Sequence, residues 1–288
     1  MEAYTDVIKT ILEKGYRKEN RTGTDTIAYA GVLFEHDMAE GFPLLTTKKV
    51  PMRLITTENE FFIKGITDKK WLQDKNNKIW NDWCTPDKVP YGNDEETILK
   101  MAAERDLGPI YGWQWRHFGA DYQGHDKDYT GQGVDQLENV VKTLQKNPND
   151  RRMIVTAWNP KDVPSMALPA CHYGFQVTIT DDKLNLAWTQ RSVDSVLGLP
   201  FNIAGYGLML HLLAKESGYK EGRLVGNLMD THIYVNHLEG IEEQLERTPK
   251  DLPKIETKNF TSIFDWEHKD TKVIGYKPHP TIEFKVAI

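Results

Sequence analysis

The residues best suited to chemistry are gathered in one stretch of the chain, residues 168–206. Cys171 stands directly before His172, and Arg191, Ser192 and Asp194 follow further along the same stretch. A cysteine attacks as its thiolate, which forms readily where cationic or dipolar groups lie near the sulfur. The stretch therefore indicates nucleophilic thiol chemistry, with Arg191 as the candidate cationic neighbour.

Each of these residues also has a plain structural interpretation. Cys171 could be a small buried apolar residue, since one Cys-His dipeptide is a weak signal. Arg191 and Ser192 could form an exposed surface pair, and Asn202 could cap the helix that follows it. Local sequence alone leaves these alternatives open.

The elements that must position these residues follow from local patterns. Strands are expected over residues 175–179 and 184–188, joined by a polar turn, and a helix is expected over 203–217. Cys171 then lies just before one strand, and Arg191 and Ser192 lie just past the end of the next. Loops at strand ends are common places for pockets.

The rest of the chain alternates helical and strand patterns, which predicts an α/β (α+β) fold. Helices are expected over residues 4–16, 52–64, 94–104 and 134–145 and around 235–245, and strands over 26–34 and 153–158. Residues from about 84 to 105 form a variable-looking insert to which we assign no chemistry. Cys84, within it, is expected to be a bystander.

Composition narrows the class of protein. The 288 residues suffice for one large or two small globular domains, and the net charge of −6 argues against a general nucleic-acid binder. No apolar run is long enough to cross a membrane, and no signal peptide is expected. Two cysteines are too few for a disulfide scaffold, so we expect a cytoplasmic protein.

Several motifs occur together and in one order along almost the whole chain. They are RTGT at Arg21, GFPLLTTKK at 41–49, LGPIYGWQWR at 107–116, DRR at 150–152, AWNP at 157–160, LPACH at 168–172, QRSVD at 190–194, LGLPFNIAGY at 197–206 and DTHIYVNH at 230–237. In these motifs the sequence resembles the thymidylate synthase family. Several ordered motifs are far more specific than any one of them.

The resemblance implies a reaction and a nucleophile. Cys171 would add to C6 of dUMP, which makes C5 nucleophilic, and C5 would take a one-carbon unit from 5,10-methylenetetrahydrofolate. Hydride from the folate would then give dTMP and dihydrofolate. Glu58, His172 and Tyr111 would support the proton transfers. No metal is expected.

The resemblance also implies how the nucleotide is bound. Asn202 would recognise the pyrimidine, since an amide can match both N3–H and O4 of uracil, whereas a cytosine-specific branch carries aspartate there. The other substrate-binding residues would be Gln190, Ser192, Asp194, the sugar-binding His232 and Tyr234, and the phosphate-binding Arg21, Arg191, Arg151 and Arg152.

A folate site and a homodimer follow from the same resemblance. Arg151 and Arg152 would cross the interface of a sheet-to-sheet dimer, and the C-terminal residues would close over the ligands. The chain would be one catalytic domain, residues 1–288, with a large mixed sheet flanked by helices. The folate would contact Lys49, Ile79, Trp80, Trp83, Asp194, Leu197, Gly198, Phe201 and Ile288.

The sequence departs from the family pattern at a few positions, namely Glu60, Phe61, Ala170 and Met229. These departures support an alternative, a dUMP hydroxymethylase, in which water captures the one-carbon intermediate and tetrahydrofolate leaves unoxidised. A second alternative is a non-catalytic dimer that binds nucleotide or RNA through its arginines. The retained Cys171 and Glu58 argue against the second.

Overall fold

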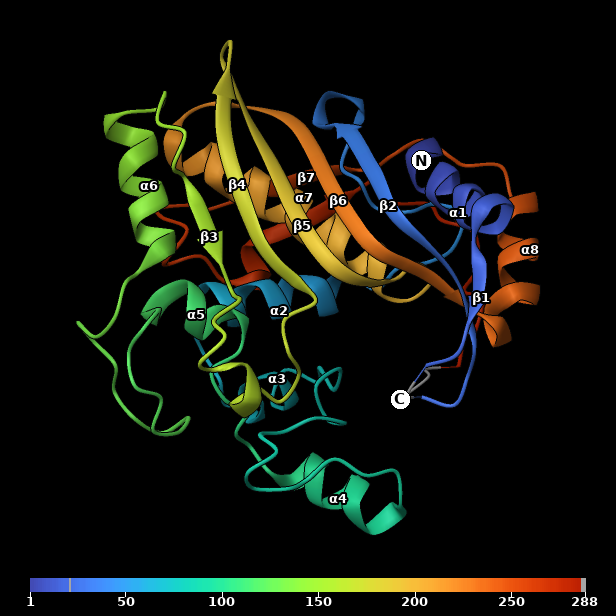
Figure 1. Cartoon of the computed structure of the whole chain (residues 1–288). Helices are drawn as coiled ribbons and strands as arrows, with labels where there is room; N and C mark the ends of the chain where they lie inside the picture. Colours follow the sequence, from blue (N-terminus) through green and yellow to red (C-terminus); the bar gives the residue numbers. More distant parts are fainter. Residues whose placement is uncertain (21, 286–288) are drawn as a thin grey trace.

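The protein is built around a six-stranded mixed sheet (Figure 1). The computed structural model describes residues 1–20 and 22–285, so Arg21 and Ile288 lie outside the described residues. The strand order is β1-β2-β6-β5-β4-β3, and only β5 and β6 run parallel. The strands are β1 (Tyr16–Lys18), β2 (Thr26–Asp37), β3 (Ile154–Thr156), β4 (His172–Thr180), β5 (Lys183–Asp194) and β6 (Lys220–Tyr234).

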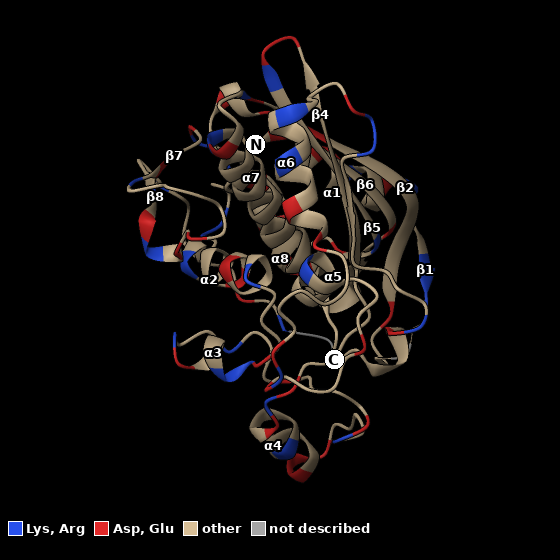
Figure 2. Cartoon of the chain, turned by 90° about the vertical axis from the view of Figure 1, so that its left-hand side faces the viewer, with Lys and Arg blue, Asp and Glu red and all other residues tan. Residues whose placement is uncertain are grey.

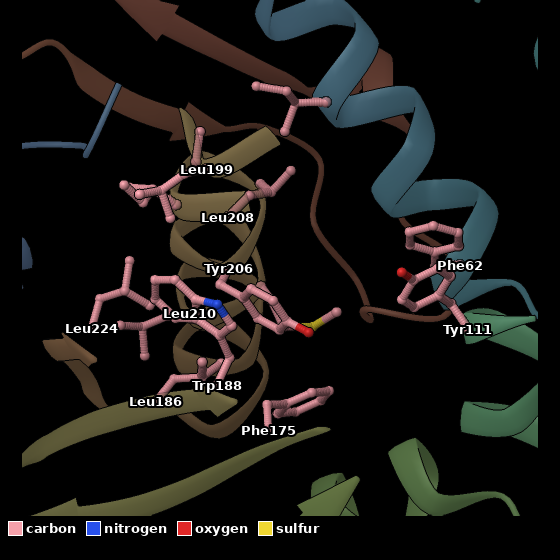
Figure 3. Packing of buried hydrophobic residues seen from close by; sticks show 14 of the residues in the cluster. Phe62, Tyr111, Phe175, Leu186, Trp188, Leu199, Tyr206, Leu208, Leu210 and Leu224 are labelled. Atoms are coloured by element: carbon pink, nitrogen blue, oxygen red, sulfur yellow. The ribbon is translucent and has the colours of Figure 1, made fainter. Parts of the chain in front are cut away.

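Helices cover one face of this sheet, as the edge-on view in Figure 2 shows. The long helix α7 packs against β5 and β6 and also against α2. Trp188 of β5 stacks on Tyr206 of α7 with ring centroids 5.2 Å apart, inside the core drawn in Figure 3. The helices are α1 (Glu2–Lys14), α2 (Met52–Ile63), α3 (Lys70–Gln73), α4 (Glu95–Ala103), α5 (Tyr111–His117), α6 (Gln136–Lys146), α7 (Gly198–Ser217) and α8 (Leu238–Glu246).

The other face of the sheet carries exposed apolar side chains. Leu33, Ile154 and Met229 are each more than half exposed there. The register places Leu33 opposite Asn227 and Ile154 opposite Gln176, both of which also point away from the helices. Large apolar patches that face water mark interaction surfaces.

The expected helices and strands are present, with ends that differ by a few residues, but one local prediction was wrong and one open alternative is excluded. Arg191 and Ser192 lie inside β5 instead of past its end, because pairing with β6 continues to Asp194. Asn202 lies within α7 and does not cap it. The helix begins at Gly198, after a turn in which Asp194 Oδ1 accepts hydrogen bonds from the backbone N–H groups of Val196 and Leu197.

Two smaller units lie outside the main sheet. β7 (Lys254–Thr257) and β8 (Thr271–Ile274) form a two-stranded sheet. The insert, residues 84–105, projects with α4 from one end of the molecule (Figure 1). Over the described part of the chain, no helix has the length and apolar character needed to span a membrane.

Candidate active site

A cavity of about 660 Å³ opens where β5 and β6 end and β4 begins. Because β5 and β6 run parallel, their carboxyl ends meet at one edge of the sheet, as in ligand sites of other α/β sheets. We call this cavity the main pocket. Its lining includes Lys18, Trp83, Tyr91, Trp158, Leu168, Cys171, Arg191, Ser192, Asp230, His232 and Tyr234.

Cys171 and Arg191 lie side by side in the main pocket. Arg191 Nη2 is 3.7 Å from Cys171 Sγ, and the backbone N–H of Arg191 donates to the carbonyl of Cys171 over 2.9 Å. Arg191 is held by the carbonyls of Ala170 and Pro169, at 2.9 and 2.7 Å. A fixed guanidinium at this distance favours the thiolate over the thiol. The structure therefore confirms that the hairpin brings this cation to the cysteine.

His172 lies behind the cysteine as a neutral imidazole. Burial lowers the pKa of His172 to about 3. Its ring stacks on Tyr111 at 4.3 Å, and its Nδ1 lies 2.9 Å from Tyr206 Oη. The Tyr111 hydroxyl accepts a 2.8 Å hydrogen bond from the backbone N–H of Cys171, and burial raises its pKa well above the usual range. Neither group carries charge near neutral pH.

Glu58 is a carboxyl of the site whose pKa lies near neutral pH. It projects from α2 into a second, smaller cavity of about 20 Å³, which is room for about one water molecule. Burial raises the pKa of Glu58 to about 7, although a hydrogen bond from Trp80 Nε1 opposes the shift. A carboxyl with this pKa can both release and accept a proton near neutral pH.

Asn202 lines the same small cavity. Its Oδ1 accepts a 2.9 Å hydrogen bond from Gln190 Nε2, and Gln190 Oε1 in turn accepts one from Trp188 Nε1. This chain of bonds orients the Asn202 amide. Sequence reasoning missed Asn59, which lines the cavity from α2 beside Glu58 and is nearly buried. Its position next to a candidate acid was the only signal.

The strand ends bring further predicted residues into the main pocket. Ser192, His232 and Tyr234 all line it, and the His232 and Tyr234 rings lie 5.3 Å apart. Two charged residues there were not predicted, Lys18 and Asp230, which form an ion pair of 2.5 Å at its edge. Asp230 opens a motif already noted, so its position in the sequence was a usable signal.

The predicted folate-binding residues are only partly brought together. Trp83 lines the main pocket and packs edge-on against Trp80, with ring centroids 6.1 Å apart. Phe201 lines the small cavity. Lys49 is exposed, while Asp194 is engaged with the start of α7. Ile79 packs on the core, and Leu197 and Gly198 form the beginning of α7.

Arg151 and Arg152 do not line the main pocket of their own chain. Both are exposed before β3, and Arg152 pairs with Asp150 at 2.6 Å. Arg21, the other predicted phosphate ligand, lies outside the described residues. Among those residues, no group of three or more acidic, histidine or cysteine side chains is placed to hold a metal ion.

The side chains at which the sequence departs from the family pattern line neither of the two cavities. Glu60 is buried on another side of α2, where it pairs with Lys64 and with the side chain and backbone N–H of His268. Met229 is exposed on the face of the sheet that the helices leave uncovered, which we call the bare face. Phe61 is buried in the core. Ala170 is also fully buried. None of the four lines either cavity.

Fold and site together define an α/β protein whose main pocket holds a cysteine beside a fixed arginine. A family model described as thymidylate synthase matches residues 2–288, and this chain belongs to the thymidylate synthase family.

Two relatives illustrate this similarity. Over 286 residues, the chain is 43% identical to a thymidylate synthase of Homo sapiens, which covers 99% of this chain and 90% of that protein. It is also 43% identical over 286 residues to a bifunctional dihydrofolate reductase-thymidylate synthase of Paramecium tetraurelia. The chain spans only 61% of that longer protein. Neither relative is named a hydroxymethylase, so the comparisons do not favour that alternative.

Proposed function

We propose that this protein converts dUMP to dTMP with 5,10-methylenetetrahydrofolate, through a covalent adduct between Cys171 and C6 of the uracil ring. The observation that carries the proposal is the pairing of Cys171 with Arg191, because a thiolate is the nucleophile that such an addition needs. Residues 1–288 would act as one catalytic domain. We also infer a reducing compartment such as the cytoplasm, where Cys171 is not oxidised.

The main pocket has the features that the nucleotide needs. The thiolate of Cys171 adds to C6, and the electrons of the C5–C6 double bond move toward C5 and O4. Asn202, oriented by Gln190, recognises the uracil edge, while His232 and Tyr234 contact the sugar. Arg191 and Ser192 face the phosphate from β5. When the product forms, the Sγ–C6 bond breaks and the thiolate is restored.

The residues around the main pocket also fit a reduced folate. Trp83, Trp158 and Leu168 give it an aromatic and apolar wall, which suits a planar ring system. The folate, when bound, supplies the one-carbon unit and the hydride. Trp83 would stack near the ring, with Trp80 and Ile79 behind it.

Proton transfer falls to Glu58. Its pKa near 7 lets it take up and return a proton beside the pyrimidine, through the small cavity that it shares with Asn202. His172 stays neutral and holds its place between Tyr111 and Tyr206. Tyr111 fixes the backbone at Cys171 through the bond from its N–H.

The site would be completed in a homodimer. The bare face of the sheet offers an apolar surface around Leu33, Ile154 and Met229 for a second copy. Arg151 and Arg152 lie beside this face at β3 and are absent from the main pocket of their own chain. They would therefore supply charge to the phosphate held by the partner.

A product assay tests the proposed reaction. The protein is mixed with dUMP and methylenetetrahydrofolate, nucleotides are identified by mass spectrometry, and dihydrofolate is followed by absorbance. We expect dTMP and dihydrofolate in equal amounts. Hydroxymethyl-dUMP without dihydrofolate would refute the proposal, as would nucleotide binding without any product.

A further inference from the structure

The insert is tied to the rest of the molecule by a buried ammonium group. Lys69, directly before α3, is 1% exposed, and its Nζ donates hydrogen bonds to three backbone carbonyls. Those of Asn81 and Trp83 lie 3.3 and 2.7 Å away, just before the insert, and the third belongs to Met101 in α4. Hydrogen bonds from a charged donor are stronger than neutral ones.

Gln73, at the other end of α3, repeats this connection. Its Nε2 donates to Asn81 Oδ1 over 2.9 Å and to the carbonyl of Ala102 over 3.1 Å. The backbone N–H of Lys69 donates to the carbonyl of Arg105 over 2.9 Å. α3 therefore holds the start and the end of the insert together.

We call these hydrogen bonds of Lys69 and Gln73 the clasp. The clasp affects the main pocket through two aromatic side chains. Trp83, whose carbonyl Lys69 holds, lines the pocket, and so does Tyr91 from within the insert. The two arrive from a segment that makes no strand with the main sheet. Their position depends on how firmly the ends of the insert are held, and small displacements of groups that bind a ligand are costly.

We propose that Lys69 is a positioning residue for the folate-binding wall of the main pocket, because it fixes the backbone that carries Trp83 and Tyr91. The inference rests on the proposed function, since it assumes that a reduced folate lies against this wall. Lys69 itself does not line the pocket. Its loss should weaken folate binding and leave the binding of dUMP largely intact, because Cys171, Arg191 and Asn202 lie on other elements.

The ionisation of Lys69 gives a readout that a purely structural role would not move. Burial lowers its pKa to about 8, whereas Cys84, Glu104 and Asp82 nearby act to raise it. A neutral amine has two protons for three carbonyls, so the clasp weakens as pH rises past 8. Folate affinity should fall between pH 7 and 9.5 in the wild type.

The test compares Lys69→Met with Lys70→Met. Lys70 is the matched control, since it stands next in the chain but is half exposed and pairs with Asp74. For Lys69→Met we expect the KM for methylenetetrahydrofolate to rise on the order of tenfold. The KM for dUMP and kcat should stay within about twofold, since the groups at the reacting atoms are untouched. Only Lys69→Met should lose the fall in folate affinity above pH 8.

Two further measurements make the result decisive. Hydrogen exchange over residues 81–105 should quicken in Lys69→Met and not in Lys70→Met. The Kd of tetrahydrofolate, measured by quenching of tryptophan fluorescence with dUMP present, needs no turnover. If the wild type made no thymidylate, the proposed function would fail, while this Kd would still test Lys69.

An unchanged folate KM and Kd in Lys69→Met would overturn the inference, even with faster exchange. A parallel loss of dUMP affinity and kcat would also overturn it, since it would indicate general damage. Should Lys69→Met not fold, Gln73→Leu takes its place, because it removes the second connection and leaves Lys69 with its three carbonyl partners. The same weakening of folate binding, of smaller size, is expected.

Discussion

The indole Nε1 of Trp80 donates a 2.8 Å hydrogen bond to Glu58 Oε1. This bond joins Trp80, which packs on the pocket-lining Trp83, to a carboxyl whose pKa burial has raised to about 7. If a folate binds against Trp83 as proposed, any shift that it imposes on Trp80 would change the pKa of Glu58 through this hydrogen bond.

Replacing Glu58 with glutamine should lower kcat by about 10²- to 10⁴-fold, because proton transfer loses its acid and base. The wild-type profile of kcat against pH should show an ionisation near pH 7, and the variant should lack it. Steady-state kinetics between pH 5 and 9 measure both effects. An unchanged ionisation in Glu58→Gln would assign it to another group.

The stability of the same variant tests the raised pKa itself. Because the folded-state pKa lies above the usual 4.5, this carboxyl stabilises the fold fully below pH 4.5 and loses that contribution as pH rises through 7. The free energy of unfolding of Glu58→Gln minus that of the wild type should therefore be about 1–2 kcal/mol larger at pH 8 than at pH 4. Thermal melts at the two pH values measure the difference.

Cys171→Ser should lower activity by about 10³-fold or more, since a hydroxyl at this place is a far weaker nucleophile than a thiolate. The variant should still bind dUMP. The matched control is Cys84→Ala, which removes the second cysteine of the sequence, inside the insert. Mass spectrometry with 5-fluoro-dUMP and methylenetetrahydrofolate should detect a covalent adduct in the control and none in Cys171→Ser.

His172→Gln should lower kcat only on the order of tenfold, less than the loss of a general acid would, because the imidazole is already neutral. The lowered pKa has a second consequence. The neutral ring stabilises the fold fully above pH 6.5, and this contribution is lost as pH falls toward 3. In thermal melts, the Tm of His172→Gln relative to that of the wild type should therefore rise as the pH is lowered from 7 to 4.5.

Glu60→Leu should change stability and leave the product unchanged. Burial opposes ionisation of Glu60, but hydrogen bonds from Lys64 and His268 outweigh it and lower its pKa. Removing the carboxylate leaves both partners unpaired, at a cost of about 1–3 kcal/mol. Denaturant unfolding and product analysis measure the two effects. A hydroxymethyl product from Glu60→Leu, or from the wild type, would indicate that Glu60 influences the reaction.

Two inactive variants should restore activity when mixed. The first is Cys171→Ser, and the second combines Arg151→Ala with Arg152→Ala. In a mixed dimer, one site would keep both its own Cys171 and the partner's intact arginine pair. Activity should appear after the variants are unfolded and refolded together and should be far lower when they are refolded separately. Equal activity in both preparations would place the arginines' effect within their own chain.

Much of this protein could be predicted from the sequence because its signals are local. The helix over Met52–Ile63 and the strands on either side of the turn at 181–182 follow from periodicity and turn chemistry. The thiol, its motif and Asn202, which we propose recognises the pyrimidine, are likewise visible as residue types in a fixed order. Local energetics determine such features, so no knowledge of distant contacts is needed.

Other features depend on contacts between residues far apart in the chain. Because β5 pairs with β6 as far as Asp194, Arg191 lies inside the strand. This strand geometry brings the guanidinium to Cys171. The burial that separates the pKa values of Glu58 and His172 comes from the packing of α2, α5 and α7 around them. Glu60, an unexplained carboxylate in the sequence, is accounted for by its ion pair with Lys64 and, from far along the chain, its hydrogen bonds with His268. Residue type sets what a side chain can do, but its ionisation and partners depend on the surroundings that tertiary packing creates.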